Sequence, residues 1–233
     1  MGKKTIHYLL IILLSFACNS TDNTQEIFYL KGELNAKDGT KIYLKSQEFN
    51  EIIPIDTSTL KNKVFSFSGH LNRPVVYGIY IENLPGVLGI VMENDSIHIK
   101  INPQDITKSI IKGSTLHSTY HDFLKKSFAI SSKIDQLYPL FQKARAEDNF
   151  KKLKAINDQM KKIQQESEAF AINFARNNPD SYIAAYALHT VITNANLPVD
   201  SIKKVYDNFT PFVKKGDFSL EILHYIIEND SLH

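Results

Sequence analysis

The spacing of two histidines, His117 and His121, is the one in this chain that comes closest to the spacing of a metal-binding site. They lie four positions apart in a segment with helical periodicity, so their rings share one face and could hold one metal ion. A useful site needs a third ligand, which Asp122 cannot supply because it projects from the neighbouring face. The HExxH arrangement of zinc proteases is absent. The sequence therefore favours two surface histidines without a metal and leaves the pair as weak candidate ligands.

No other pattern in the sequence specifies a reaction. The GxSxG elbow of hydrolases, the phosphate-binding Walker loop and the GxGxxG nucleotide motif are all absent. With one cysteine, the chain can form neither an internal disulfide nor a CxxC redox pair. We therefore predict a protein without a cofactor and without catalytic activity. An enzyme whose site is assembled from dispersed residues is the alternative.

The one cysteine, Cys18, follows a segment with the features of an export signal. Two lysines near Met1 give a positive start, residues 6–16 are mostly apolar, and a polar run follows at 19–26. The apolar run is about half of the ~20 residues that a membrane-spanning helix needs. This order favours an export signal over a retained transmembrane anchor.

The tetrapeptide at 15–18, SFAC, resembles a lipobox, although Ser15 stands where leucine is usual. We predict that residues 1–17 are a signal peptide and that cleavage before Cys18 exposes its thiol and amine for acylation. Residues 18–26 then form a polar tether, and two or more acyl chains would anchor it stably. An ordinary secretory signal with an incidental cysteine is the alternative.

The charge of the chain gives no indication of a nucleic-acid partner. It has 27 basic and 25 acidic residues, and two of the basic ones, Lys3 and Lys4, lie in the predicted signal peptide. The remainder is balanced at 25 against 25 with its lysines scattered, whereas phosphate contacts require a clustered basic surface. At 43% hydrophobic residues, the chain is able to build a substantial core.

Residues 27–113 have the alternation of apolar and polar residues that is typical of β-strands, as in IFYLKGEL, TKIYLKS and KVFSFSG. Asp38 and Gly39 predict a hairpin turn between the first two runs, and Pro54 predicts an edge strand or a bulge because proline cannot donate to a ladder. Seven or eight such strands predict an antiparallel β-sandwich or half-open barrel. Aromatic residues on these strands are expected in the core and not on a sugar-binding platform; they include Phe65, Phe67 and Tyr77.

Residues 114–233 change to a period between three and four, which predicts a mainly helical region. Ser114 or Thr115 is expected to cap the first helix, and the turn at 147–149 separates it from the second. Two long helices joined by a short turn predict an antiparallel helical hairpin, with Pro139 kinking or splitting its first helix. Shorter helices are expected to follow, starting near Ser181, Pro198 and Ser219.

Each long helix of the predicted hairpin carries one apolar stripe. The first contains Leu116, Tyr120, Phe123, Leu124 and Phe128, and the second contains Phe150, Leu153, Ile156, Met160, Ile163, Phe170 and Phe174. Lysines flank the second stripe, and we expect them on a solvated face. A membrane-binding or acidic-partner surface is the alternative for these lysines, which are Lys151, Lys152, Lys154, Lys161 and Lys162.

Several stretches of the sequence resemble a known family. They are FYLKGELNAKDGTKIYL, IDTSTLKNKVFSFSGHLNRPVVYGIYI, MENDSIHIKI and KGSTLHSTYHDF. Together they resemble a domain-of-unknown-function family of envelope lipoproteins of Gram-negative bacteria. In that family the domain commonly precedes a thioredoxin-like domain of the AhpC/TSA and TlpA kind. The later stretches NNPDSYIAAYAL and VYDNFTPFVKK are similar to the helical linker of those proteins.

The resemblance implies a non-catalytic module tethered at the bacterial cell envelope. In the fused proteins the reaction belongs to the thioredoxin domain and its CxxC, so that activity transfers to no residue of this chain. We expect a lipid-anchored, periplasm-facing protein whose function is binding or scaffolding. Its expected partners are the membrane, through the N-terminal lipid, and an envelope protein such as a thioredoxin-like one. The N-terminal part of a thioredoxin-fused oxidoreductase is the alternative.

Overall fold

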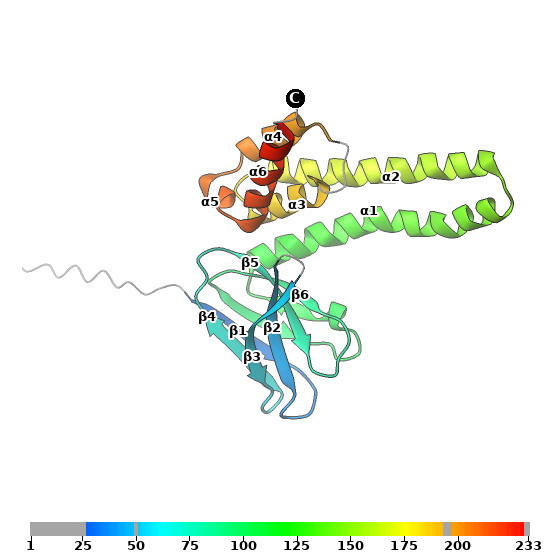
Figure 1. The fold of residues 1–233 in the computed structure, drawn as a ribbon. Coiled ribbons are helices and arrows are strands. Elements are labelled where there is room, and N and C mark those ends of the chain that lie inside the picture. Colours follow the sequence, from blue (N-terminus) through cyan, green and yellow to red (C-terminus); the bar gives the residue numbers. More distant parts are fainter. Residues whose placement is uncertain (1–26, 49–50, 193–196, 231–233) are drawn as a thin grey trace, which may run out of the picture.

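The computed structural model describes residues 27–48, 51–192 and 197–230. The predicted signal peptide, Cys18 and the tether therefore lie outside the described residues. Strands β1 to β8 come first in the chain, and helices α1 to α6 follow. Figure 1 shows the strands packed into one unit and the long helices α1 and α2 extending away from it as a hairpin. The predicted α+β class, an N-terminal sandwich followed by a mainly helical region, is confirmed.

The strands form two four-stranded sheets. Sheet A has the order β4-β1-β7-β8, with the bounds Val64–Gly69, Phe28–Glu33, Ser96–Lys100 and Ile110–Lys112. Sheet B has the order β3-β2-β5-β6, with the bounds Glu51–Thr59, Lys41–Glu48, Val75–Ile81 and Leu88–Met92. Neighbouring strands are antiparallel except β1 and β7, which run parallel. The described strands form no closed barrel.

Alternation along the strands places one face of each sheet in a shared core. The apolar residues of both sheets join in one buried cluster, whose fully buried members include Leu30, Ile42, Leu44, Ile79, Ile90 and Ile97. The aromatic residues Phe65, Phe67 and Tyr77 are buried in the same cluster, as predicted. Burial of apolar surface at roughly 25 cal/mol per Å² is the main force that holds the two sheets together.

The predicted hairpin around Asp38 and Gly39 is wrong, although the turn itself is present. Gly39 has a φ of +94°, which glycine adopts readily. Strand β1, however, has β4 on one side and β7 on the other, so it has no free edge for β2. The chain instead crosses to sheet B, and the amide of Leu34 donates to the carbonyl of Lys63 as it leaves sheet A, at 2.9 Å.

Pro54 lies where the sequence predicts it. Strand β3 is an edge strand of sheet B, so a missing backbone donor costs no ladder hydrogen bond on its open side. Pro54 is opposite Lys45 of β2, and the register of the two strands shifts between Leu44 and Lys45. Both predicted explanations, an edge position and a bulge, therefore apply to the same residue.

Helices α1 (Thr115–Ala146) and α2 (Phe150–Asn177) form the predicted antiparallel hairpin. Ser114 caps α1 by accepting a hydrogen bond from the amide of His117, and Asn149 caps α2 by accepting one from Lys152. Pro139 does not split α1, which is continuous across it. Its side chain is exposed, so water can reach the carbonyl that loses its helical partner.

The shorter helices pack at one end of this hairpin (Figure 1). They are α3 (Tyr182–Ile192), α4 (Val199–Asp207), α5 (Pro211–Lys214) and α6 (Asp217–Asp230). Helix α3 is apolar on all sides and lies at the centre of a second core, which also receives Phe123 of α1. The short helix α5 and the 3-10 turn Ile106–Lys108 were not predicted from the sequence.

Part of the apolar stripe of each long helix is exposed. Phe128 is 70% exposed and Phe150 is 77% exposed. Tyr138 and Leu140 are also exposed. Figure 1 shows that the part of the hairpin nearest the turn at 147–149 runs beyond the short helices, so α1 and α2 have only each other to pack against there.

Candidate functional site

The histidine pair has two different environments. His121 is exposed, whereas His117 is only 7% exposed because the first turn of α1 packs on β6. The Nδ1 atom of His117 accepts a hydrogen bond from the amide of Val91, at 3.4 Å. The prediction of two surface histidines is therefore wrong for His117. Its burial follows from its place at the junction of strands and helices, which helical spacing alone does not reveal.

The two rings lie near each other, with centroids 6.5 Å apart. Within the described ranges, no group of three or more histidine, cysteine, aspartate or glutamate side chains could hold a metal ion. Asp122 lies 3.9 Å from the Nδ1 atom of His121 but does not complete a site with His117. The arrangement is that of a buried packing residue beside an exposed neighbour.

Burial, and to a smaller degree the neighbouring His121, lowers the pKa of His117 from 6.5 to about 4. Between these values the unfolded chain binds a proton that the folded protein does not, so stability falls as pH is lowered through this window. At about 1.4 kcal/mol per pKa unit, we expect the free energy of unfolding to fall by roughly 2 kcal/mol from pH 7 to pH 5 on account of this group. Urea unfolding at both pH values measures it.

A His117→Gln variant is the control, since glutamine cannot take up the proton. The variant can be less stable at both pH values, so the quantity to compare is the change in unfolding free energy between them. We expect that change to be smaller in the variant by about the same 2 kcal/mol. Equal changes in both proteins would show that His117 does not carry the pH dependence.

Three groups of contacts join the strands to the helices. Val91 of β6 is buried in the helical core. Ser114 donates to Oε1 of Glu93 at 3.1 Å, in addition to capping α1. Arg73, in the loop between β4 and β5, forms an ion pair with Asp217 at the start of α6. These contacts position the helical region on the sandwich at more than one point.

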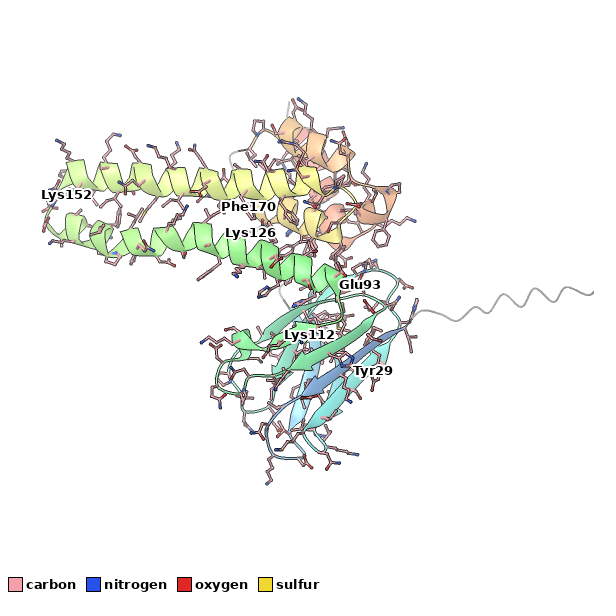
Figure 2. All side chains as sticks on the ribbon, turned by 180° about the vertical axis from the view of Figure 1, so that it is seen from behind. Tyr29, Glu93, Lys112, Lys126, Lys152 and Phe170 are labelled. Atoms are coloured by element: carbon pink, nitrogen blue, oxygen red, sulfur yellow. The ribbon has the colours of Figure 1, made fainter. Side chains whose placement is uncertain are left out.

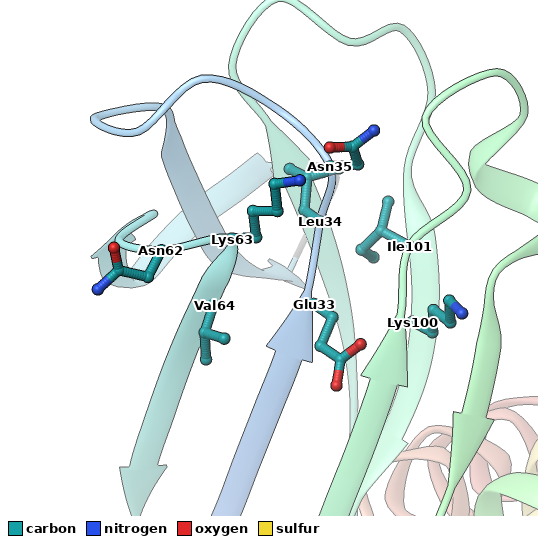
Figure 3. A pocket seen from close by; sticks show the side chains of 8 residues that line it. All are labelled: Glu33, Leu34, Asn35, Asn62, Lys63, Val64, Lys100 and Ile101. Atoms are coloured by element: carbon teal, nitrogen blue, oxygen red, sulfur yellow. The ribbon is translucent and has the colours of Figure 1, made fainter.

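A hollow of about 330 Å³ lies at one end of sheet A, as Figure 3 shows. Its apolar floor is made by the buried residues Leu34 and Ile101. Charged and amide side chains from the ends of β1 and β7 and from the β3–β4 turn form its rim, namely Glu33, Asn35, Asn62, Lys63 and Lys100. Such a rim can hold a small polar ligand, and it offers no serine, cysteine or histidine as a nucleophile or base.

A second hollow, of about 370 Å³, lies between α1, α2 and α3. Its lining combines hydroxyl and amide groups with apolar side chains, including Ser127, Ser131, Gln164 and Thr190. Neither of these two hollows is lined by a histidine or a cysteine, two side chains that often act as base or nucleophile in a catalytic site.

On the exposed face of sheet A, basic side chains that are far apart in the sequence lie close together. Lys31 of β1 lies opposite His98 of β7, and His98 lies opposite Lys112 of β8. Lys100 is the next outward residue of β7 and lies opposite Glu33. Three of the lysines that are scattered in the sequence, Lys31, Lys100 and Lys112, therefore lie on one face of this sheet. The sequence contains the outward positions, but only the strand register places them side by side.

The fold and these surfaces define an α+β protein in which an eight-stranded sandwich is followed by a helical hairpin and shorter helices. Residues 28–120 match the family described as Domain of unknown function (DUF4369). The match runs from the first residue of β1 into the second turn of α1, and it confirms the resemblance of these residues to such a family. No curated protein and no solved structure matches the chain.

Proposed function

We propose that the protein is a lipid-anchored component of the bacterial cell envelope that acts by binding or scaffolding. The observation that carries this proposal is the position of the one cysteine, Cys18, directly after an apolar run and before a polar tether. The exposed surfaces of sheet A and of the hairpin support a binding role, since they present both polar and apolar side chains to solvent. None of the described helices is both long and apolar enough to cross a bilayer.

The intact mass of the protein extracted from the membranes of its native host tests the anchor. We expect the mass of residues 18–233 plus acyl groups. A Cys18→Ser variant should lose the acyl mass completely, because the acylated thiol is gone, whereas the matched Asn19→Ser variant should keep it. An unacylated wild-type product in the soluble fraction would overturn the anchor. A mass larger by a whole domain would favour the N-terminal part of a thioredoxin-fused oxidoreductase.

The partner, on this proposal, is an envelope protein such as a thioredoxin-like one, and no cofactor takes part. We expect such a partner to bind the exposed apolar side chains of the hairpin, which are Phe128, Tyr138, Leu140 and Phe150. Crosslinking in cells through this surface should capture one partner. Finding none, together with turnover by the isolated protein, would favour an enzyme with a dispersed site.

A further inference from the structure

Two lysines, with a histidine between them, stand in one row on the exposed face of sheet A. Lys31, His98 and Lys112 occupy directly opposite positions on β1, β7 and β8, and all three are exposed. Lys100, the next outward residue of β7, adds a third exposed lysine to this face. Within the described residues, neither Lys31, Lys100 nor Lys112 forms an ion pair. Three lysines without an ion pair leave this face with an excess of positive charge, which an anionic surface would complement.

The rest of this face is mostly polar, apart from Ile110 of β8, which is 53% exposed and lies opposite Lys100. Its described strand residues contribute three serine hydroxyls and the phenol of Tyr29, and Glu33 is their one carboxylate, so lysines outnumber acids three to one. Figure 2 shows Tyr29 and Lys112 on this sheet, away from the hairpin that carries Lys126 and Lys152. A face that combines lysines with hydroxyl donors is suited to phosphate groups and not to an apolar partner.

The chain length before β1 determines how far this face can lie from the predicted lipid. Nine residues separate Cys18 from Phe28, the first residue of β1. At about 3.5 Å per residue, an extended chain of this length reaches at most ~35 Å. Strand β1 is an inner strand of sheet A and carries both Tyr29 and Lys31. The sheet that carries Lys31, Lys100 and Lys112 is therefore the sheet to which the predicted tether leads.

We propose that the exposed face of sheet A docks on the anionic phosphate headgroups of the membrane in which Cys18 is anchored. This inference rests on the proposed lipid anchor and adds an orientation to it. Each lysine near an anionic bilayer changes the docking equilibrium by about fivefold, so three lysines give on the order of 100-fold at low salt. The short tether keeps the face close to the bilayer, which raises its effective concentration there.

Lysine reactivity in the acylated protein tests the orientation. The protein from native membranes is placed in vesicles of phosphatidylcholine, with or without phosphatidylglycerol, and given a short pulse of an amine-acetylating reagent. We expect Lys31, Lys100 and Lys112 to react about fivefold more slowly, or slower still, in the anionic vesicles at low salt. Lys126 and Lys151, exposed on the hairpin, should react at one rate in both. High salt should abolish the difference by screening.

A Lys31→Gln/Lys112→Gln double variant should lose the protection of Lys100, and a Lys126→Gln/Lys151→Gln variant should keep it. Equal labelling rates in the two kinds of vesicle, with the acyl mass present, would overturn docking while leaving the anchor intact. Protection by inorganic phosphate without vesicles would overturn the membrane as the occupant. Absence of the acyl mass would overturn the anchor instead, and the same labelling with anionic vesicles would still decide whether the face docks.

Discussion

A Gly113→Ala variant is expected to lose about 3 kcal/mol of its free energy of unfolding, enough to unfold a sizeable fraction of a marginally stable protein. Gly113 has a φ of +96°, and a Cβ atom there would lie 2.1 Å from the backbone oxygen of Ser96. The left-handed conformation costs a non-glycine residue about 1–2 kcal/mol. The clash adds to this, because the obstacle is backbone of β7 that cannot rotate away. Urea unfolding monitored by circular dichroism measures the loss.

Gly39→Ala is the matched control for this prediction. Gly39 has nearly the same φ, +94°, but nothing lies within 4 Å of a Cβ atom built there. Its substitution should therefore cost about 1 kcal/mol, which is the conformational part alone. The difference between the two variants isolates the steric contact with Ser96. Equal losses in the two variants would show that the backbone at the junction of β8 and α1 moves enough to relieve the contact with Ser96.

A Phe123→Ala variant is expected to lose about 3–5 kcal/mol of unfolding free energy, the range for removing a phenylalanine from a core. Phe123 is 2% exposed and packs its ring on three others: it stacks on Phe170 at 5.4 Å between centroids and meets Phe174 and Tyr186 at 5.0 and 5.9 Å. These contacts join α1, α2 and α3. Thermal and urea unfolding of the purified variant test the prediction.

Phe128→Ala, on the same helix, is its control. The side chain of Phe128 is mostly exposed, so its removal should change stability by less than about 0.5 kcal/mol. The two variants compare a side chain in the helical core with a side chain on the exposed surface of the same helix. A similar loss of unfolding free energy in both variants would contradict the exposure of Phe128. It would indicate that another surface covers this side chain in solution.

The positions of the strands and long helices follow from the sequence because alternation and capping are local signals. Helix α1 begins directly after Ser114, and helix α2 begins directly after the turn predicted at 147–149. The pairing of strands does not follow, because it depends on which edges are free. The Asp38-Gly39 turn has the right local chemistry, yet β1 is already paired on both sides by strands that come later in the chain.

The candidate surfaces were predictable only in part. The alternation of β1 and β7 indicates that Lys31 and Lys100 point outward, whereas β8, with the sequence IIK, has no alternation that would place Lys112. The parallel pair between β1 and β7 is needed to bring these lysines together. His117 shows the opposite case, since its helical spacing suggested an exposed site and its tertiary contact with β6 buries it. In both cases tertiary pairing, which has no local signal, decides the outcome.

The parallel pairing of β1 with β7 also has a consequence for the order of folding. Tyr29 is opposite Ser96, 67 positions later in the chain, whereas the two long helices are joined by the three residues 147–149. Closing the loop between β1 and β7 costs more chain entropy than closing the short turn between the helices, and this cost precedes the stabilising contacts. Folds rich in contacts between distant parts of the sequence therefore form slowly. The first strand made is therefore among the last to gain both neighbours, and until β7 arrives its open edge is available to other chains. During this interval, a chaperone that covers the open edge of β1 would protect the chain from such pairing.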